Sequence, residues 1–245
     1  MSEGPASDEV AVVIPARNEA DRIQATVTAA IGLSAAALVV VVDDGSKDGT
    51  AAVARQAGAV VTRHARNRGK GAAMETGAEA VRLLDQREHR DRPRHLLFLD
   101  ADLAGTAALA GPLIDPVLAG KADMTIAVFA ATVKLGGHGL VVGLSGAGIR
   151  RATGWQPAQP LNGQRCLTRA AFDAATPLAP RWGAETGLTI DLLRQGMRVV
   201  EIEVPLEHRA TGADWRSQLH RARQFADVAR ALASRRAYRY GPEAR

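Results

Sequence analysis

The chain has 245 residues, 47% of them apolar and 23% charged, which suits one large α/β domain or two small ones. Its single cysteine excludes an intrachain disulfide and a zinc site built from several cysteines. The formal net charge of +5 suits an anionic partner, but the scattered arginines and few aromatic residues form no nucleic-acid recognition motif, so we expect no nucleic acid to bind.

Residues 1–9 are polar and acidic, unlike a secretory signal, and we expect a disordered tail on a cytoplasmic protein. After this tail, strand and helix patterns alternate at short intervals. Continuously apolar, β-branched segments predict strands at 10–16, 37–46, 59–64, 95–103 and 124–131. Helical spacing of apolar residues, with caps and turn residues, predicts helices at 17–33, 46–58 and 67–85. This alternation predicts an α/β fold with a doubly wound, mostly parallel central sheet flanked by helices.

The pattern changes from about residue 131. Residues 134–154 are glycine-rich and apolar, and we assign no element to them. The remaining segments predict a short strand and helix within 156–172, a helix at 183–196, a strand at 198–210 and a long amphipathic helix at 214–240. The apolar face expected on the last helix contains Leu219, Ala222, Phe225, Ala226, Ala229 and Leu232.

Polar residues gather where four of the predicted strands end. They are the segments PARNE (15–19), DDGS (43–46), NRGKG (67–71) and DAD (100–102). In doubly wound sheets, ligands bind beyond the carboxyl ends of the strands. We therefore expect one rim of the sheet to carry all four segments.

Two aspartates separated by one residue end the strand in HLLFLDADL. Mg²⁺ and Mn²⁺ bind oxygen ligands, often one or two carboxylates together with substrate phosphates. Asp100 and Asp102 therefore suit a divalent-metal site, in which one carboxylate contacts the metal and the other reaches through water or a sugar hydroxyl. A solvated turn is the alternative that this spacing alone leaves open.

Two other segments suit a nucleotide. Asp43 and Asp44 can accept hydrogen bonds from a base imide or ribose hydroxyls, while an Asx turn with a helix cap is the structural alternative. The loop NRGKG is not a P-loop, because Lys70 is followed by Gly71 rather than by serine or threonine. Its glycines still allow close backbone approach, and a helix start beside a lysine can bind phosphate.

The segments VVIPARNEA, VVVVDDGSKDGT, NRGKGAAMETG and LFLDADL, in this order, resemble the motifs of the nucleotide-sugar glycosyltransferases of family 2, which have the GT-A fold. Within that family the chain is most similar to polyprenyl-phosphate sugar transferases and to the glucosyl-3-phosphoglycerate synthase type. The resemblance implies a single domain over 10–245. Its nucleotide-sugar half would cover 10–130, and its acceptor half would cover 131–245 and end in the amphipathic helix.

The resemblance further implies metal-dependent transfer of a sugar from a nucleotide-diphosphate sugar, with Mg²⁺ or Mn²⁺ as cofactor. The implied acceptor is anionic: either a polyprenyl phosphate reached from the inner face of the membrane or a small phosphorylated molecule. In the nucleotide-sugar half, Pro15, Ala16, Asn18 and Glu19 would line the nucleotide pocket, Asp43 or Asp44 would hold base or ribose, Lys70 would lie near base or phosphate, and Asp100 and catalytic Asp102 would hold the metal.

Three residues of the second half would complete the site. By resemblance, Arg165 would meet the anionic acceptor, Glu185 would act as general base or orient the acceptor, and His208 would complete the metal shell. Each residue also has a purely structural interpretation. Arg165 could be a surface arginine, Glu185 a carboxylate favoured at a helix start, and His208 a structural histidine.

A nucleotidyltransferase that makes an activated sugar is the main alternative function. Such enzymes usually carry a glycine- and arginine-rich loop directly after the first strand, where this chain has PARNEADRI without glycines. A signalling receiver module is a further alternative, suggested by VVVVDDGS, but it would be much shorter and would not need the later aspartate pair. We therefore expect a glycosyltransferase.

Overall fold

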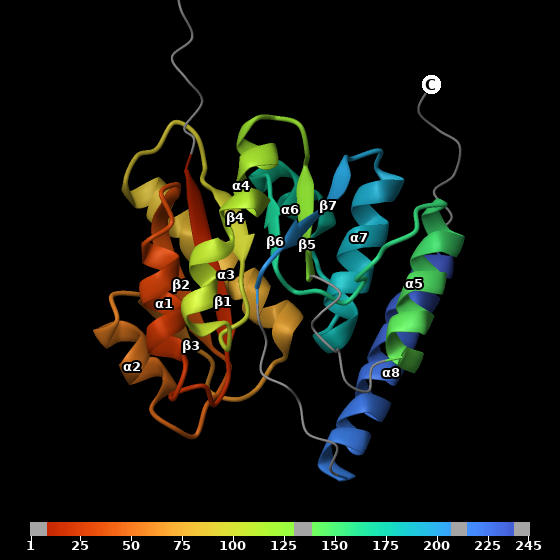
Figure 1. Ribbon diagram of the computed structural model, residues 1–245, viewed down its shortest axis with the longest axis horizontal. Helices are drawn as coiled ribbons and strands as arrows, with labels where there is room; N and C mark the ends of the chain where they lie inside the picture. Colours follow the sequence, from red (N-terminus) through yellow and green to blue (C-terminus); the bar gives the residue numbers. More distant parts are fainter. Residues whose placement is uncertain (1–8, 130–138, 207–214, 238–245) are drawn as a thin grey trace, which may run out of the picture.

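The structure is a computed structural model that describes residues 9–129, 139–206 and 215–237, with side chains of the last helix described for residues 222–235. These residues contain a seven-stranded sheet in the order β3-β2-β1-β4-β6-β5-β7, flanked by helices (Figure 1). The strands are β1 (Val10–Ala16), β2 (Ala36–Asp43), β3 (Val60–Arg63), β4 (His95–Phe98), β5 (Met124–Phe129), β6 (Arg165–Leu167) and β7 (Val199–Val204). The α/β fold with a central sheet is therefore confirmed.

The helices of the first half alternate with the strands as the sequence predicts, and one further helix, between β4 and β5, was not predicted. The helices are α1 (Ile23–Ile31), α2 (Thr50–Gln56), α3 (Lys70–Arg87), α4 (Gly111–Leu118), α5 (Gly139–Thr153), α6 (Arg169–Ala175), α7 (Ala184–Arg194) and α8 (Trp215–Ala237), with short 3₁₀ helices η1 (Ala104–Leu109) and η2 (Arg181–Gly183).

Neighbouring strands run parallel except at β6, which is antiparallel to both β4 and β5. Phe98 at the end of β4 pairs with Arg165 at the start of β6. The loop that precedes β6 therefore lies at the same edge of the sheet as the residues that follow β4. This reversal brings part of the second half of the chain to the rim of the first half.

Two apolar clusters cover the two faces of the sheet. On one face Val12 and Ile14 of β1 pack with α1 and α4, which contribute Ile23 and Leu113. On the other face Val13 and Phe98 pack with α3, α6 and α7, and the rings of Phe98 and Phe172 stack with centroids 5.4 Å apart. Alternate residues of β1 face opposite clusters, as the pleat of a strand requires. A strand buried on both faces explains the continuous apolar run in VAVVIPA.

Helix α5 forms in the glycine-rich segment to which the sequence analysis assigned no element. Val141, Ser145 and Ile149 are buried one helical turn apart, so the helix has a packed face despite its glycines. One of these glycines allows a close approach: a Cβ on Gly148 would lie 2.4 Å from a methyl carbon of Leu232 in α8. Helices α5 and α8 lie side by side beyond α7 (Figure 1).

Helix α8 is amphipathic as predicted, but its buried face matches the expected one only in part, at Leu232. Val228, Ala231 and Leu232 are buried together with the polar Gln224 and Asp227, whereas Phe225 is 44% exposed and Ala222 is exposed. Apolar spacing favoured the face with Phe225. On the observed face, Val228 and Leu232 pack in one cluster with residues of α5 and α7. Gly183 of η2, a position without a side chain, lies against the backbone of α8 at Asp227.

Most of the predicted tail, 1–9, lies outside the described residues. Glu9 is described and forms an ion pair with Arg90 at 2.6 Å. In the described parts of the chain, no helix combines the length and apolar character that crossing a bilayer requires.

Candidate functional site

The carboxyl ends of β1, β2, β3 and β4 lie at one edge of the sheet, because these four strands run parallel. Main-chain hydrogen bonds continue past the strands. The amide of Asp44 donates to the carbonyl of Ala16 at 2.9 Å, and the amide of His64 donates to the carbonyl of Asp43 at 2.9 Å. The polar segments that the sequence analysis expected on one rim therefore gather at this edge.

The loop after β1 is bound to the loop after β2 through Asn18. Its amide donates to Ser46 Oγ at 2.9 Å, and its side-chain oxygen accepts from the amide of Lys47 at 2.9 Å. Asn18 has a φ of +55°, a left-handed conformation that asparagine tolerates better than most residues. Pro15 and Glu19 on either side are half-buried, while Ala16 is buried. These residues form one wall of the rim.

Asp43, at the end of β2, is fully buried. Its Oδ1 accepts a hydrogen bond from the amide of Ser46 at 2.8 Å, and its Oδ2 lies 3.1 Å from Nε of Arg63. Arg63 also donates to the carbonyl of Ser46 at 2.9 Å. The Asp43 carboxylate therefore holds the turn after β2.

Asp44 is 6% exposed and also binds within the protein. Its Oδ1 accepts from the amide of Arg68 at 2.7 Å and contacts Nδ1 of His64 at 2.7 Å, and its Oδ2 accepts from the amide of Gly69 at 2.8 Å. In this arrangement neither Asp43 nor Asp44 presents an exposed carboxylate to base or ribose. Both carboxylates instead accept hydrogen bonds from backbone amides of the loops that form the rim.

Lys70 lies between two carboxylates from distant parts of the chain. Its Nζ is 2.7 Å from Oδ1 of Asp100 and 3.0 Å from Oε1 of Glu185. The exposed side-chain fractions are 16% for Lys70, 26% for Asp100 and 3% for Glu185. Burial opposes the charge on Lys70, but the two carboxylates outweigh it and raise the pKa of the ammonium above its usual value. We call Lys70, Asp100 and Glu185 the charged cluster.

Gly163 makes room for the charged cluster and was not singled out from the sequence. A Cβ at this position would lie 2.1 Å from Nζ of Lys70 and 2.9 Å from Oδ1 of Asp100. Gly163 belongs to the loop before β6, which reaches this edge because β6 is antiparallel. The only signal in the sequence is a glycine two residues before a short strand, a common turn feature that does not indicate a partner.

The turn that carries Asp100 and Asp102 is held by α1. Thr26 Oγ1 donates to the carbonyl of Ala101 at 2.8 Å, and Arg22 Nη1 donates to the carbonyl of Asp102 at 3.1 Å. These bonds use main-chain carbonyls and leave the carboxylates to other partners. The two aspartates, both half-buried, are therefore fixed one residue apart at the end of β4.

Asp100 and Asp102 fit a divalent cation by the chemistry of their donors. Mg²⁺ in proteins commonly takes one or two carboxylates and fills its shell with substrate phosphates and water. No group of three histidine, cysteine, aspartate or glutamate side chains suited to a metal occurs in the described portion of the chain. A cation held by this pair would therefore depend on the substrate, or on His208, which lies outside the described residues.

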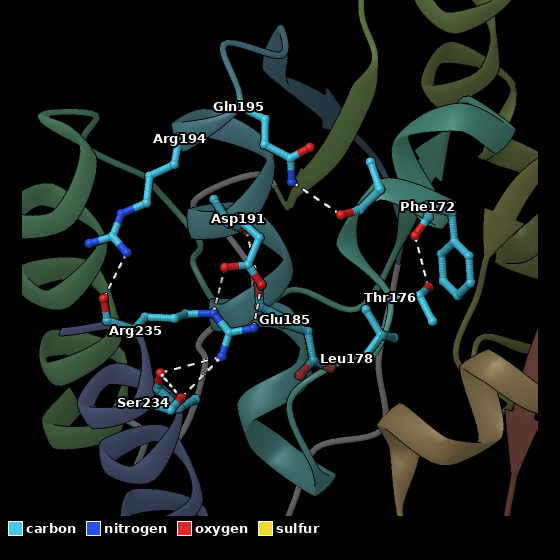
Figure 2. A network of polar contacts seen from close by, with 12 residues as sticks. Phe172, Thr176, Leu178, Glu185, Asp191, Arg194, Gln195, Ser234 and Arg235 are labelled. Atoms are coloured by element: carbon cyan, nitrogen blue, oxygen red, sulfur yellow. Dashed lines mark hydrogen bonds and ion pairs between the residues drawn. The ribbon is translucent and has the colours of Figure 1, made fainter. Parts of the chain in front are cut away.

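Glu185 reaches the charged cluster because α7 begins at this edge. Helix α8 holds the second half of α7: Arg235 pairs with Asp191, Nε to Oδ1 at 2.8 Å, and Arg194 Nη1 donates to the carbonyl of Arg235 at 2.7 Å. Figure 2 shows Glu185 at the start of α7 and the Asp191–Arg235 pair further along the same helix.

Arg165 is fully buried at the start of β6. Its guanidinium donates to the carbonyls of Asn162 at 2.8 Å, Glu185 at 3.1 Å and Pro160 at 3.1 Å. Burial lowers the pKa of Arg165 to about 10, so the side chain remains charged at neutral pH. The acceptor contact expected of Arg165 does not fit this placement, and the residue instead ties the loop before β6 to the start of α7.

Comparison with known proteins points to one family. The model of "Glycosyl transferase family 2" matches residues 11–140. Glycosyltransferase AglJ of Haloferax volcanii is 29% identical over 214 residues, which are 86% of this chain and 67% of AglJ. The uncharacterized protein MJ1222 of Methanocaldococcus jannaschii is 35% identical over 119 residues, which are 49% of this chain and 46% of that protein.

Solved structures agree with this family. Glucosyl-3-phosphoglycerate synthase from Mycobacterium tuberculosis, in complex with Mn²⁺, uridine diphosphate and glucosyl-3-phosphoglycerate, superposes with a TM-score of 0.71 at 26% identity, over 93% of this chain and 79% of that chain. Complexes of the same enzyme contain Mg²⁺ with uridine diphosphate, or Mn²⁺ with uridine-diphosphate-glucose and phosphoglyceric acid.

Proposed function

Because this chain belongs to glycosyl transferase family 2 and is a glycosyltransferase, we propose that it transfers a sugar from a nucleotide-diphosphate sugar to an anionic acceptor. The charged cluster carries this proposal, because one ammonium, that of Lys70, joins a carboxylate of the predicted metal pair, Asp100, to a carboxylate of the acceptor half, Glu185. Family membership favours glycosyl transfer over the nucleotidyl transfer that the sequence left as an alternative.

In this proposal the rim at the ends of β1 to β4 binds the nucleotide. Pro15, Ala16, Asn18 and Glu19 line the pocket, while Asp43 and Asp44 hold the loops that form its floor. Lys70 supplies a fixed positive charge at the first residue of α3, beside the free amides of the helix start, where a phosphate is favoured. Uridine-diphosphate-glucose is the first donor to test, because the similar mycobacterial enzyme binds it.

Asp100 and Asp102 would hold Mg²⁺ or Mn²⁺, which in such sites neutralises charge on a departing diphosphate. Glu185 is held against Lys70, with its carboxylate almost excluded from solvent. We assign it to the acceptor, either as the group that takes the hydroxyl proton or as the group that orients the hydroxyl. Lys70 keeps Asp100 and Glu185 together and offsets the repulsion between their charges.

The acceptor needs a cation other than Arg165, and we propose Arg181. Its side chain is exposed and no described residue forms an ion pair with it. A Cβ on Gly69, the residue before Lys70, would lie 2.9 Å from Cγ of Arg181, so the arginine stem rests beside the start of α3. A guanidinium there suits the phosphate or carboxylate of an acceptor.

The donor half of the proposal is tested with Asp102→Ala. We expect Mn²⁺ to increase the affinity of the wild-type chain for uridine diphosphate, measured by calorimetry, and to have little effect on the variant, because a carboxylate ligand is missing. Asp91→Ala removes an exposed carboxylate from the loop before β4, at the opposite edge of the sheet, and should bind like wild type. Unchanged Mn²⁺-dependent binding in Asp102→Ala would remove the metal site from the proposal.

The acceptor half is tested by transfer of glucose from uridine-diphosphate-glucose. One arm offers phosphoglyceric acid in solution, and the other offers vesicles that contain a polyprenyl phosphate. Transfer to either one identifies the source of the acceptor anion. Transfer only to uncharged sugars would contradict an anionic acceptor.

A further inference from the structure

We propose that His64 is a positioning residue of the donor site. Its ring holds the Asp44 carboxylate, Asp44 holds the loop before α3, and this loop delivers Lys70 to Asp100 and Glu185. The link to nucleotide binding rests on the proposed function, whereas the chain of contacts from His64 to Lys70 is independent of it.

The ring of His64 is held from both sides in the interior. Nδ1 lies 2.7 Å from Oδ1 of Asp44, and Nε2 lies 2.9 Å from Oγ1 of Thr76 in α3. The side chains of His64 and Asp44 are only 5% and 8% exposed. Because a carboxylate accepts hydrogen bonds, Nδ1 carries a proton, and in the neutral ring Nε2 accepts from the Thr76 hydroxyl. The ring thus links the end of β3 to Asp44 and to α3.

Asp44 uses both of its oxygens to hold the next loop. Oδ1 accepts from the amide of Arg68 at 2.7 Å, and Oδ2 accepts from the amide of Gly69 at 2.8 Å. Charged acceptors form hydrogen bonds that are stronger than those between neutral groups. The orientation of one carboxylate therefore fixes two successive amides, and His64 is the side chain that fixes this orientation.

The loop before α3 is also fixed by its close packing and by the conformation of its last glycine. A Cβ on Gly45 would lie 2.7 Å from the backbone of Arg66 and of Asn67, so the loop packs directly on the turn after β2. Gly69 has a φ of +91°, which only glycine adopts readily. The next residue is Lys70, which starts α3 and bridges Asp100 and Glu185. A displacement of this loop would therefore also displace Lys70 from Asp100 and Glu185.

The test uses two substitutions that each keep one nitrogen of the ring. The amide nitrogen of His64→Asn can replace Nδ1 and donate to Asp44, whereas the amide of His64→Gln reaches the position of Nε2 and leaves Asp44 without its partner. Hydrogen exchange of the Arg68 and Gly69 amides is measured by NMR in the ligand-free chain. We expect exchange in His64→Gln to be at least about tenfold faster than in wild type, and in His64→Asn to remain near wild type.

The same two variants are then titrated with uridine diphosphate and Mn²⁺. We expect His64→Gln to bind at least about tenfold more weakly and His64→Asn to bind within about threefold of wild type. His95→Gln is the matched control: His95 is a half-buried strand histidine at the opposite edge of the sheet, where its Nδ1 accepts from the amide of Arg169. It should change thermal stability without changing either readout.

Wild-type exchange of both amides in His64→Gln would overturn the inference, as would equal exchange in the Asn and Gln variants. If the histidine variants do not fold, Asp44→Asn replaces them. It has a single acceptor oxygen for the two amides, so at least one of them must exchange faster, and unchanged exchange overturns the inference. A wild-type chain that binds no uridine diphosphate would contradict the proposed function, and the exchange experiment would still decide the role of His64.

Discussion

At the scale of single residues, the charged cluster explains how two carboxylates remain close together in a half-buried site. One ammonium between Asp100 and Glu185 leaves a net charge of about minus one, which a divalent cation on Asp100 and Asp102 would further offset. The raised pKa of Lys70 means that the ammonium keeps its charge at neutral pH. Gly163 leaves no space for a side chain beside Lys70 and Asp100, so a larger residue at this position would displace the charged cluster.

Arg181 offers a test in which stability and activity should change in opposite directions. It has a φ of +54° although it is not glycine. Arg181→Gly should raise the free energy of unfolding by up to about 1 kcal/mol, because glycine adopts this conformation without strain. If the guanidinium binds the acceptor anion, the same change should raise the acceptor KM by roughly tenfold, with donor affinity unchanged. Thermal unfolding and transfer kinetics measure the two effects.

His89→Gly is the matched control for this change. His89 is exposed and has a φ of +52°, but it follows the carboxyl end of α3, whereas Arg181 lies beside the amino end. It should gain stability in the same way and leave the acceptor KM unaltered. An unaltered KM in Arg181→Gly would separate the arginine from the acceptor.

Individual site residues differ in how far the sequence could predict them. Asp100, Asp102 and Lys70 follow strand ends in a strand–helix alternation, so a local pattern was enough to bring them to one rim. Arg165 was different, because its burial follows from the insertion of β6 between β4 and β5, and that pairing is not local. The role of His64 is equally hard to predict, because its partner Thr76 is the seventh residue of α3 and its partner Asp44 lies twenty residues earlier.

At the scale of secondary-structure elements, glycines control how closely α5 and α7 approach α8. Besides Gly148 of α5, a Cβ on Gly187 of α7 would lie 2.7 Å from the guanidinium carbon of Arg235. Figure 2 shows this arginine crossing from α8 to Asp191 of α7. The position of Glu185 therefore depends on α8, although α8 contributes no residue to the charged cluster.

Gly183→Ala tests this dependence. The added Cβ would lie 2.8 Å from Cβ of Ala231 and 3.0 Å from the carbonyl oxygen of Asp227, so α8 must move away from η2. We expect a loss of about 1–3 kcal/mol in the free energy of unfolding, as for other overpacked sites. Ala231→Gly in the same chain removes one of the two contacts and should restore part of the loss.

Gly143→Ala on α5 is the control for the glycine change itself. No atom lies within 4 Å of a Cβ at this helical position, so alanine should stabilise the helix by up to about 1 kcal/mol. Equal effects of Gly183→Ala and Gly143→Ala in chemical denaturation would contradict the packing argument.

The predicted elements show the same division between local and non-local information. The five strands and three helices predicted for the first half follow from apolar periodicity and turn residues, and the structure contains all of them, although α1 begins six residues later and β4 ends five residues earlier than predicted. Helix α4, between β4 and β5, was not predicted. Helix α5 and the buried face of α8 could not be predicted in this way. Both depend on glycine positions that let two helices approach, and glycine in a sequence indicates a turn as readily as a contact.

At the scale of the whole molecule, the sheet has a second group of charges at the edge opposite the rim. Arg94, which precedes β4, donates to Asp85 near the end of α3 at 2.5 Å and also binds Glu88. Both Arg94 and Asp85 are 5% exposed. Glu9, next to β1, lies 3.8 Å from the same guanidinium. These contacts join the amino ends of β1 and β4 to α3, far from the nucleotide rim.

Arg94→Met should therefore separate stability from binding. The substitution leaves the buried Asp85 carboxylate with only the longer contact to Arg90, Nε to Oδ1 at 3.9 Å, and we expect the free energy of unfolding to fall by about 3 kcal/mol. Affinity for uridine diphosphate, measured well below the unfolding temperature, should stay at the wild-type value. Arg82→Met, which removes an exposed pair with Glu79 on the same helix, should change stability little. Weaker nucleotide binding in Arg94→Met would mean that the two edges are coupled.

The antiparallel strand β6 also has a consequence for the growing chain on the ribosome. Strand β4 can pair with β1 once residue 98 has left the ribosomal exit tunnel, but its other edge stays unpaired until residues 165–167 follow. During synthesis of the intervening segment, the nascent chain exposes an open edge of apolar residues, a template for unwanted pairing with other chains. Slow translation between β4 and β6 would lengthen this exposure, so synonymous codon changes there should alter the yield of folded protein without changing any residue.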